Sequence, residues 1–464
     1  MSTAASLLPV ETVDACIVGD DPGGLAVALS LAAFGVPAAV IRPPAASLTL
    51  QGLALRLAVL REATSTAAAC DWPEVQRRVA AAVRHHAVDE ASHRLAAAGI
   101  RVIEGAATFT GPRTVEAGGR AVTARRFVVA TGSQTQMPTI PGLSDIPVLT
   151  TDTIWELDAV PAHLAVIGGD AAAAALAQGF RRLGARVTLF AADGLLPDFD
   201  ADMAAALRDR LDADDVTLFE QARVTSVALH SDGIAVQASR GSEDGALVVS
   251  HVLVSAGRLP SIASLGLDAA GIAHGPAGIP VDGALLTANR RIFALGETSD
   301  PAAEAGLSER QGALVAQNIL LRRAVRAGDL VPMRVAHTTP AIVEMGLGET
   351  EARRRDPGCR VLRVPAGASA AALIDGPAEG HVKLIVSAKG RILGAAIMGR
   401  DAGAIAAPIA LAIGEGLTVH NLAAIQLSYP SVTDLGKRAA IAYFGDRLSN
   451  PSIRRNIRLL RWLG

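Results

Sequence analysis

The chain has 464 residues, a length that predicts roughly three domains. Half of the residues are hydrophobic but only 3% are aromatic, so small aliphatic residues and glycine must fill the core, as in stacked β–α–β units. A formal charge of -2 and a pI near 6.6 give no reason to expect a nucleic-acid partner.

The titratable side chains argue against two kinds of site. Cys16, Cys70 and Cys359 are far apart and form no CxxC pair, so neither a disulfide framework nor a cysteine-based zinc site is expected. His85 and His86 are adjacent in a predicted helix and point to different faces, so we expect no metal site.

The first residues do not resemble a signal peptide, and no apolar run predicts a spanning helix. The expectation is a soluble, cytoplasmic protein.

Two copies of one pattern occur along the chain. A buried strand predicted at Ala15–Val18 leads into the glycine cluster GDDPGG, an Ala/Leu-rich helix and the strand VPAAVIR. From Leu164 the strand LAVI leads into GGDAAA, the helix ALAQGFRRLG and the strand ARVTLF. Because parallel strands need such crossovers, the two copies predict two nucleotide-type domains. The proline-marked stretch from Pro138 to Pro161 is the predicted linker.

The pattern changes from about Arg334 onward. One predicted strand and helix are followed by two strands around Lys389–Gly390 and then by Ala-rich helices, which indicates an α+β domain. The last residues, PSIRRNIRLLRWLG, interleave arginine with leucine, isoleucine and tryptophan. A helix that caps a subunit contact is the favoured interpretation, and a tail that binds a membrane surface or a protein partner is the alternative.

Several segments, in order, resemble the pyridine nucleotide–disulfide oxidoreductase family over almost the whole chain. They are IVGDDPGGLAVA, FVVATGSQTQMPTIPGL, LAVIGGDAAAAALAQGFRRLGARVTLF, HVLVSAGRLPSIASLGL, RIFALGETSD, TTPAIVEMGLGETEA, KLIVSAKGRILGAAIMG and LSYPSVTDLGKRAA. The resemblance implies an α/β fold with two Rossmann-like dinucleotide-binding domains plus a C-terminal α+β dimerisation domain. It places an FAD-type domain at 1–150 and 271–333, an NAD(P)-type domain at 151–270 and a dimerisation domain at 334–464. It also implies a homodimer that binds FAD and NAD(P)H.

The residues that match the family's cofactor-binding positions follow from the same resemblance. They are Gly19, Asp21, Pro22, Gly23, Gly24, Arg42, Thr131, Gly132, Ser133, Gly168, Gly169, Asp170, Ala173, Gly257, Arg258, Gly296 and Glu297.

The family's redox-active cysteines and its catalytic histidine are missing. The matching stretch, from Arg42 to Ala63, contains no cysteine, and thiol exchange needs a sulfur beside the flavin. Disulfide reduction by the usual mechanism is therefore excluded. In YPSVTD, Tyr429 and Asp434 replace the histidine and glutamate, and we take them as candidate catalytic residues. Tyrosine is a poor base at neutral pH but donates a hydrogen bond, and a purely structural role for Tyr429 stays open.

Both glycine loops depart from G-x-G-x-x-G at the same position. Asp21 and Asp170 stand where the second glycine lets the backbone approach the pyrophosphate. A carboxylate at a helix N-terminus is itself favourable by about 0.3–1 kcal/mol, so each aspartate is expected to take the anion site and weaken dinucleotide binding. Arg42 stands where the family has the acidic residue that binds the adenosine ribose. Glu297 replaces the aspartate of the family's Gly-Asp pair.

Two functions remain open. The first is an FAD-dependent oxidoreductase that passes electrons from NAD(P)H to a small non-thiol acceptor such as a quinone. Retention of FAD is expected because loss of this buried cofactor would leave a costly void in its domain. The second is a degenerate, catalytically inactive member that serves as a scaffold, a regulatory partner or a binder of another ligand.

Overall fold

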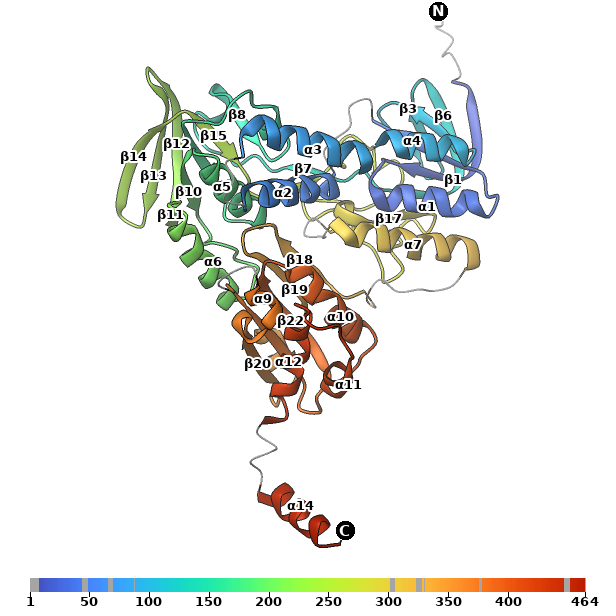
Figure 1. Ribbon diagram of the computed structural model, residues 1–464. Helices are drawn as coiled ribbons and strands as arrows, with labels where there is room; N and C mark the ends of the chain where they lie inside the picture. Colours follow the sequence, from blue (N-terminus) through green and yellow to red (C-terminus); the bar gives the residue numbers. More distant parts are fainter. Residues whose placement is uncertain are drawn as a thin grey trace, which may run out of the picture. The chain divides into compact units, whose positions relative to one another are not determined.

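The computed structural model describes residues 8–43, 49–65, 70–86, 88–300, 305–322, 328, 330–374, 378–445 and 451–463. The chain divides into two compact units, whose elements are labelled in Figure 1. Unit 1 comprises Met1–Gly194 and Val216–Asp329, and unit 2 comprises Leu195–Asp215 and Leu330–Gly464.

The first sheet of unit 1 carries the first glycine loop. Its strands lie in the order β3 (Arg101–Glu104), β2 (Ala38–Arg42), β1 (Val10–Val18), β6 (Arg120–Val129), β5 (Thr114–Ala117) and β4 (Thr108–Gly111), and β17 (Ile292–Ala294) pairs with β6. The strand β1 pairs in parallel with both β2 and β6, and its last four residues are completely buried. A continuous apolar run is what a strand covered on both faces requires, so the predicted buried strand is confirmed.

Helices α1 (Pro22–Ala33) and α7 (Ala305–Leu321) pack side by side against this sheet (Figure 1). Their backbones touch at glycines, because a Cβ atom on Gly312 would lie 2.2 Å from the Gly23 carbonyl oxygen. This close contact brings α7 to the N-terminus of α1. The remaining helices of this part are α2 (Leu50–Thr64), α3 (Trp72–His86) and α4 (Val88–Ala97).

The second parallel sheet carries the second glycine loop. Its strands lie in the order β11 (Thr217–Glu220), β10 (Arg186–Ala191), β9 (His163–Ile167), β15 (His251–Val254) and β8 (Val148–Thr150), and α5 (Ala171–Arg182) follows β9. Two antiparallel pieces complete unit 1: β12 (Arg223–His230), β13 (Gly233–Arg240) and β14 (Glu243–Val249), and the pair β7 (Ser133–Thr135) with β16 (Arg258–Pro260).

The stretch from Pro138 to Pro161 is more than the predicted linker. It contains β8, which pairs in parallel with β15 at the edge of the second sheet, and two short 3-10 turns at Leu143–Asp145 and Ile154–Glu156. A three-residue strand shows no periodicity in the sequence, so only its pairing reveals it.

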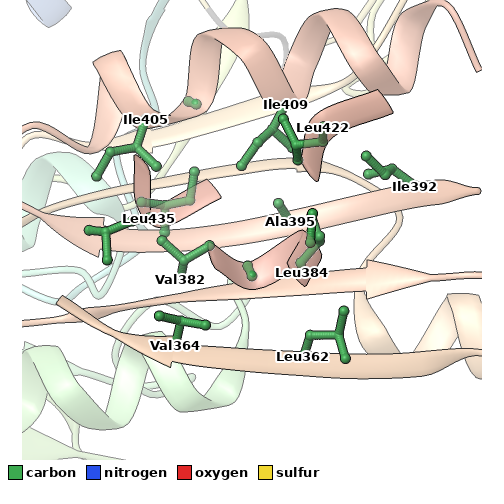
Figure 2. Packing of buried hydrophobic residues seen from close by; sticks show 14 of the residues in the cluster. Leu362, Val364, Val382, Leu384, Ile392, Ala395, Ile405, Ile409, Leu422 and Leu435 are labelled. Atoms are coloured by element: carbon green, nitrogen blue, oxygen red, sulfur yellow. The ribbon is translucent and has the colours of Figure 1, made fainter. Parts of the chain in front are cut away.

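Unit 2 is built on an antiparallel sheet in the order β18 (Met333–Ala336), β19 (Ala341–Gly346), β22 (Ile392–Gly399), β21 (His381–Val386) and β20 (Arg360–Pro365). The predicted pair of strands around Lys389–Gly390 is confirmed as β21 and β22. Figure 2 shows apolar side chains of this sheet, among them Val382 and Ala395, facing Ile405 and Ile409 of a covering helix. The helices are α8 (Glu349–Arg355), α9 (Ala370–Leu373), α10 (Ala402–Gly414), α11 (Val419–Ala424), α12 (Asp434–Ala442) and α14 (Pro451–Leu463).

Helix α6 (Ala201–Ala213) falls within the predicted limits of the NAD(P)-type domain but packs with the C-terminal sheet. The buried ammonium of Lys383 holds it there, at 2.7 Å from Asp200, 3.0 Å from Asp202 and 2.7 Å from Glu349. We call these four residues the Lys383 cluster. A buried cation needs such partners, so the cluster ties the segment to unit 2. Among the described residues, no helix is both long and apolar enough to cross a bilayer.

Candidate functional site

The carboxylate of Asp21 lies at the N-terminus of α1, where the sequence places it. Its Oδ1 accepts the Gly23 N–H at 2.9 Å and also the hydroxyl of Ser308 from α7. Pro22 occupies the first helical turn, where its missing N–H costs nothing. Asp21 is only 4% exposed, and this burial raises its pKa to about 6, against the lowering effect of the two hydrogen bonds. The aspartate therefore caps its own helix.

Asp170 repeats this arrangement at the N-terminus of α5. Its Oδ1 accepts the Ala173 N–H at 2.7 Å and the Ser255 hydroxyl, from the end of β15, at 2.8 Å. Burial raises the pKa of Asp170, while these hydrogen bonds oppose the rise. In both domains one carboxylate oxygen thus binds a helix N–H together with a serine hydroxyl, which are the donors that an anion at a helix N-terminus would use.

The glycines of both loops are in positions that exclude a side chain. Gly19 has φ +104, and a Cβ atom there would lie 2.1 Å from the Ala130 carbonyl oxygen. Gly168 has φ +142, and its Cβ would lie 1.7 Å from the Ser255 carbonyl oxygen. Neighbouring atoms also leave no room for a Cβ at Gly23, which faces Ser308 of α7, at Gly24, which faces Ala130, or at Gly169, which faces the Gly194 carbonyl. Gly132, Gly257 and Gly296 have positive φ.

Arg42, at the position of the ribose reader, forms an ion pair that the sequence did not predict. Its Nε lies 3.3 Å from Asp20 Oδ2, and its NH1 lies 3.8 Å from Glu104 Oε1. Arg42 and Asp20 are both buried. Burial raises the pKa of Asp20, and Arg42 opposes the rise. The adjacency of β1, β2 and β3 in the sheet creates this pairing, and no local pattern reveals it.

A second buried polar cluster surrounds Glu297. Ser133 donates its hydroxyl to Glu297, and Arg258 Nε lies 3.1 Å from Glu297 Oε1 and 2.6 Å from Ser133 Oγ. Arg258 NH1 also reaches Asp152 Oδ1 at 3.3 Å. Glu297 is 2% exposed, so burial raises its pKa and Arg258 lowers it. Nearby, the hydroxyl of Thr131 is buried and has no hydrogen-bond partner among the described residues.

Tyr429 and Asp434 belong to unit 2 and are not paired with each other in the contacts described. Tyr429 is 82% exposed and precedes a cis proline, whereas Asp434 begins α12 and accepts a hydrogen bond from Arg438 at 2.9 Å. Their role as catalytic residues stays a prediction.

The cysteines lie away from the expected redox position. Cys16 is completely buried in β1, as predicted, and burial raises its pKa far above the usual range. Cys70 is partly exposed, whereas the nearby Trp72 is buried. Within the described ranges, no group of three or more His, Cys, Asp or Glu residues is arranged to hold a metal ion.

A cavity of about 410 Å³ lies between α2, α3 and the turn at Ile154–Glu156. Its lining is Arg56, Gln76, Val79, Ala80, Val83, Arg84 and Trp155. Arg56 lies over the Trp155 ring at 5.9 Å from its centre, and burial lowers the pKa of this guanidinium.

Two sheets with parallel pairing around a glycine loop that leads into a helix, followed by an antiparallel α+β domain, define the class of two-dinucleotide flavoproteins. The model of the pyridine nucleotide-disulphide oxidoreductases matches residues 13–318, and the model of their dimerisation domain matches residues 332–440. The chain therefore belongs to the pyridine nucleotide-disulphide oxidoreductase family. Members are FAD-dependent oxidoreductases, and the dimerisation domain implies homodimers in the family.

The chain is similar to several characterised members. Mercuric reductases of Bacillus cereus and Staphylococcus aureus are 31% and 30% identical over 353 residues, which is 75% of this chain but only 56% and 64% of theirs. A dihydrolipoyl dehydrogenase of Thermus scotoductus is 30% identical over 347 residues, covering 72% of this chain and 73% of that protein. The chain thus spans less than two thirds of the two mercuric reductases.

Among solved structures, the HOCl-induced flavoprotein disulfide reductase RclA from Escherichia coli has the same fold. It superposes with a TM-score of 0.82 and 25% identity, covering 91% of this chain and 98% of RclA. Its Cu(II) complex has a TM-score of 0.84 at 24% identity, covering 93% of this chain and 99% of RclA.

The residues at the first loop do not fit the pyrophosphate of FAD in this conformation. The Gly23 N–H, which would face a phosphate, already donates to Asp21, and protein atoms bury that carboxylate almost completely. The second loop has the same conflict at Asp170. At Glu297, Oε1 is bonded by Ser133 and Arg258, whereas the buried Oε2 has no hydrogen-bond partner among the described residues.

Proposed function

We propose that this chain is a family member that no longer reduces disulfides and that serves as a binding or scaffold protein. In this proposal Asp21 and Asp170 take the anion sites that dinucleotide phosphates occupy in catalytic relatives. The observation that carries the proposal is the buried carboxylate of Asp21, which accepts both the helix N–H of Gly23 and the hydroxyl of Ser308. The absence of cysteine from Arg42 to Ala63 supports the loss of thiol chemistry.

Electrostatics explain why an aspartate in the anion site opposes FAD binding. A phosphate about 4 Å from an ionised carboxylate meets a repulsion of about 4 kcal/mol at the effective dielectric near a protein surface. That energy corresponds to roughly a thousandfold in affinity. Because the pKa of Asp21 is about 6, its carboxylate is mostly charged at neutral pH and loses that charge below the pKa. Any residual FAD affinity should therefore rise as the pH falls through about 6.

The second candidate is an FAD-dependent oxidoreductase that passes electrons from NAD(P)H to a small non-thiol acceptor such as a quinone. The buried hydroxyl of Thr131, which lacks a hydrogen-bond partner among the described residues, favours it, because a bound ligand would satisfy this group. When bound, FAD supplies hydride and electron transfer. Glu297, held by Arg258 and Ser133, would place a carboxyl group at the Gly-Asp position.

A flavin titration of the purified full chain separates the two candidates. We expect a colourless protein that binds added FAD weakly, and an Asp21→Gly variant that binds FAD at least tenfold more tightly. Asp170→Gly is the matched control, because it removes the corresponding carboxylate from the other loop and should leave FAD affinity unchanged. Far-ultraviolet circular dichroism checks that both variants fold. A wild-type protein that purifies with FAD, bleached by NADH or NADPH, would establish the second candidate instead.

A further inference from the structure

The helix α14 (Pro451–Leu463) separates basic from aliphatic residues around its axis. At about 100° per residue, Arg455, Arg458 and Arg461 fall within an arc of roughly 120°. The aliphatic residues of its described part occupy an arc of roughly 160° on the other side, and a tryptophan falls inside the basic arc, between Arg455 and Arg458. These aliphatic residues and the tryptophan are Ile457, Leu459, Leu460 and Trp462.

The aliphatic side of α14 is exposed in the chain itself. The side chains of Ile457, Leu459 and Leu460 are 51%, 54% and 68% exposed, and that of Trp462 is 87% exposed. No described residue of the chain covers them. A helix of this length is marginal in water without a surface to pack on, so α14 requires an external partner.

Charge indicates the nature of that partner. From Pro451 to Gly464 the sequence contains four arginines and no acidic residue. Two copies of α14 packed through their aliphatic sides would leave all eight arginines on the outer faces, where neither helix offers an acidic residue to pair with them. A layer of anionic phosphates over an apolar interior matches both sides of the helix at once.

We propose that α14 docks the protein on the surface of an anionic lipid bilayer. The helix lies in the plane of the interface, since 13 residues extend only about 20 Å, less than the hydrocarbon thickness of about 30 Å. The aliphatic side enters the acyl region, the arginines contact lipid phosphates, and Trp462 lies at headgroup depth. This docking does not depend on whether the protein binds a flavin.

Sedimentation of the full chain with lipid vesicles tests the proposal. We expect binding to vesicles of phosphatidylcholine with phosphatidylglycerol, and much weaker binding to phosphatidylcholine alone. The double variant Arg455→Glu/Arg458→Glu should lower the partition coefficient at least twentyfold, since each arginine near the surface contributes roughly fivefold. The double variant Arg113→Glu/Arg120→Glu is the control, because it changes net charge equally at exposed positions of unit 1.

The fluorescence of Trp462 gives a second readout. Trp462 is exposed, whereas Trp72 and Trp155 are buried, so a blue shift on adding anionic vesicles reports insertion of α14. A Trp462→Phe variant should lose the shift. Equal binding to neutral and anionic vesicles, or equal loss in the control double variant, would overturn the proposal. A third result would also overturn it: the wild type does not bind vesicles but forms an oligomer, and Leu460→Asp dissociates that oligomer. In that case α14 would be a protein interface.

Discussion

Replacing Glu344 with glutamine should make unit 2 more stable at alkaline pH. Glu344 lies on β19 and is 7% exposed, and its Oε1 accepts the backbone N–H of Asp200 at 2.5 Å. Burial raises its pKa to about 7, with a smaller contribution from the charge of Asp200, whereas Arg334 at 3.8 Å lowers it. Glutamine keeps the oxygen that accepts the hydrogen bond but carries no charge.

The size of the effect follows from the pKa difference between the folded and unfolded states. The folded value is about 7 and the usual value is 4.5, which corresponds to about 3 kcal/mol in the free energy of unfolding. Because the folded pKa is raised, this stability is fully present below the unfolded pKa and is lost as the pH rises through about 7. Glu344→Gln should therefore match the wild type in acid and exceed it by up to about 3 kcal/mol above that pH.

Hydrogen exchange followed by mass spectrometry measures this difference locally. Peptides that cover β19 and α6 should exchange more slowly in Glu344→Gln than in the wild type at alkaline pH, with no difference in acid. Glu379→Gln is the control, since Glu379 is exposed and pairs with Arg210 at the surface. An identical difference at both pH values would refute the reasoning, because the effect would then not come from titration of Glu344.

Two further substitutions test the packing of each unit. Lys383→Met should lower the free energy of unfolding by about 3–5 kcal/mol, because it leaves the three carboxylates of the Lys383 cluster without their buried cation. Urea titration followed by circular dichroism measures this change. A loss below about 1 kcal/mol would show that water or Arg363 replaces the lysine. Trp72→Ala should lower the free energy of unfolding by about 3–5 kcal/mol, because the side chain is 2% exposed, its ring centre lies 5.1 Å from that of Phe180, and its N–H donates to the Leu157 carbonyl. A thermal midpoint equal to that of the wild type would contradict this prediction.

The strand–helix–strand motif around each glycine loop could be predicted from sequence, because each motif follows a local pattern. The same is true of Asp21 and Asp170 as caps, since a cap and the N–H that it accepts lie two or three residues apart. The serine that each carboxylate also binds lies far along the chain, at Ser308 and Ser255. No local pattern could identify these serines, because their positions depend on how α7 and β15 pack.

The sequence by itself determined the family, the missing thiols and the position of the two aspartates, because these depend on residue identity and on short spacings. Tertiary structure decided three other features: the ion pair of Arg42 with Asp20, the edge strand β8, and the attachment of Leu195–Asp215 to the C-terminal sheet. Each of these joins segments distant in sequence, and burial makes each arrangement favourable only when the partner is present. The same physics governs the first glycine loop, where the carboxylate of Asp21, which water would otherwise solvate, is buried and accepts the Gly23 N–H and the Ser308 hydroxyl.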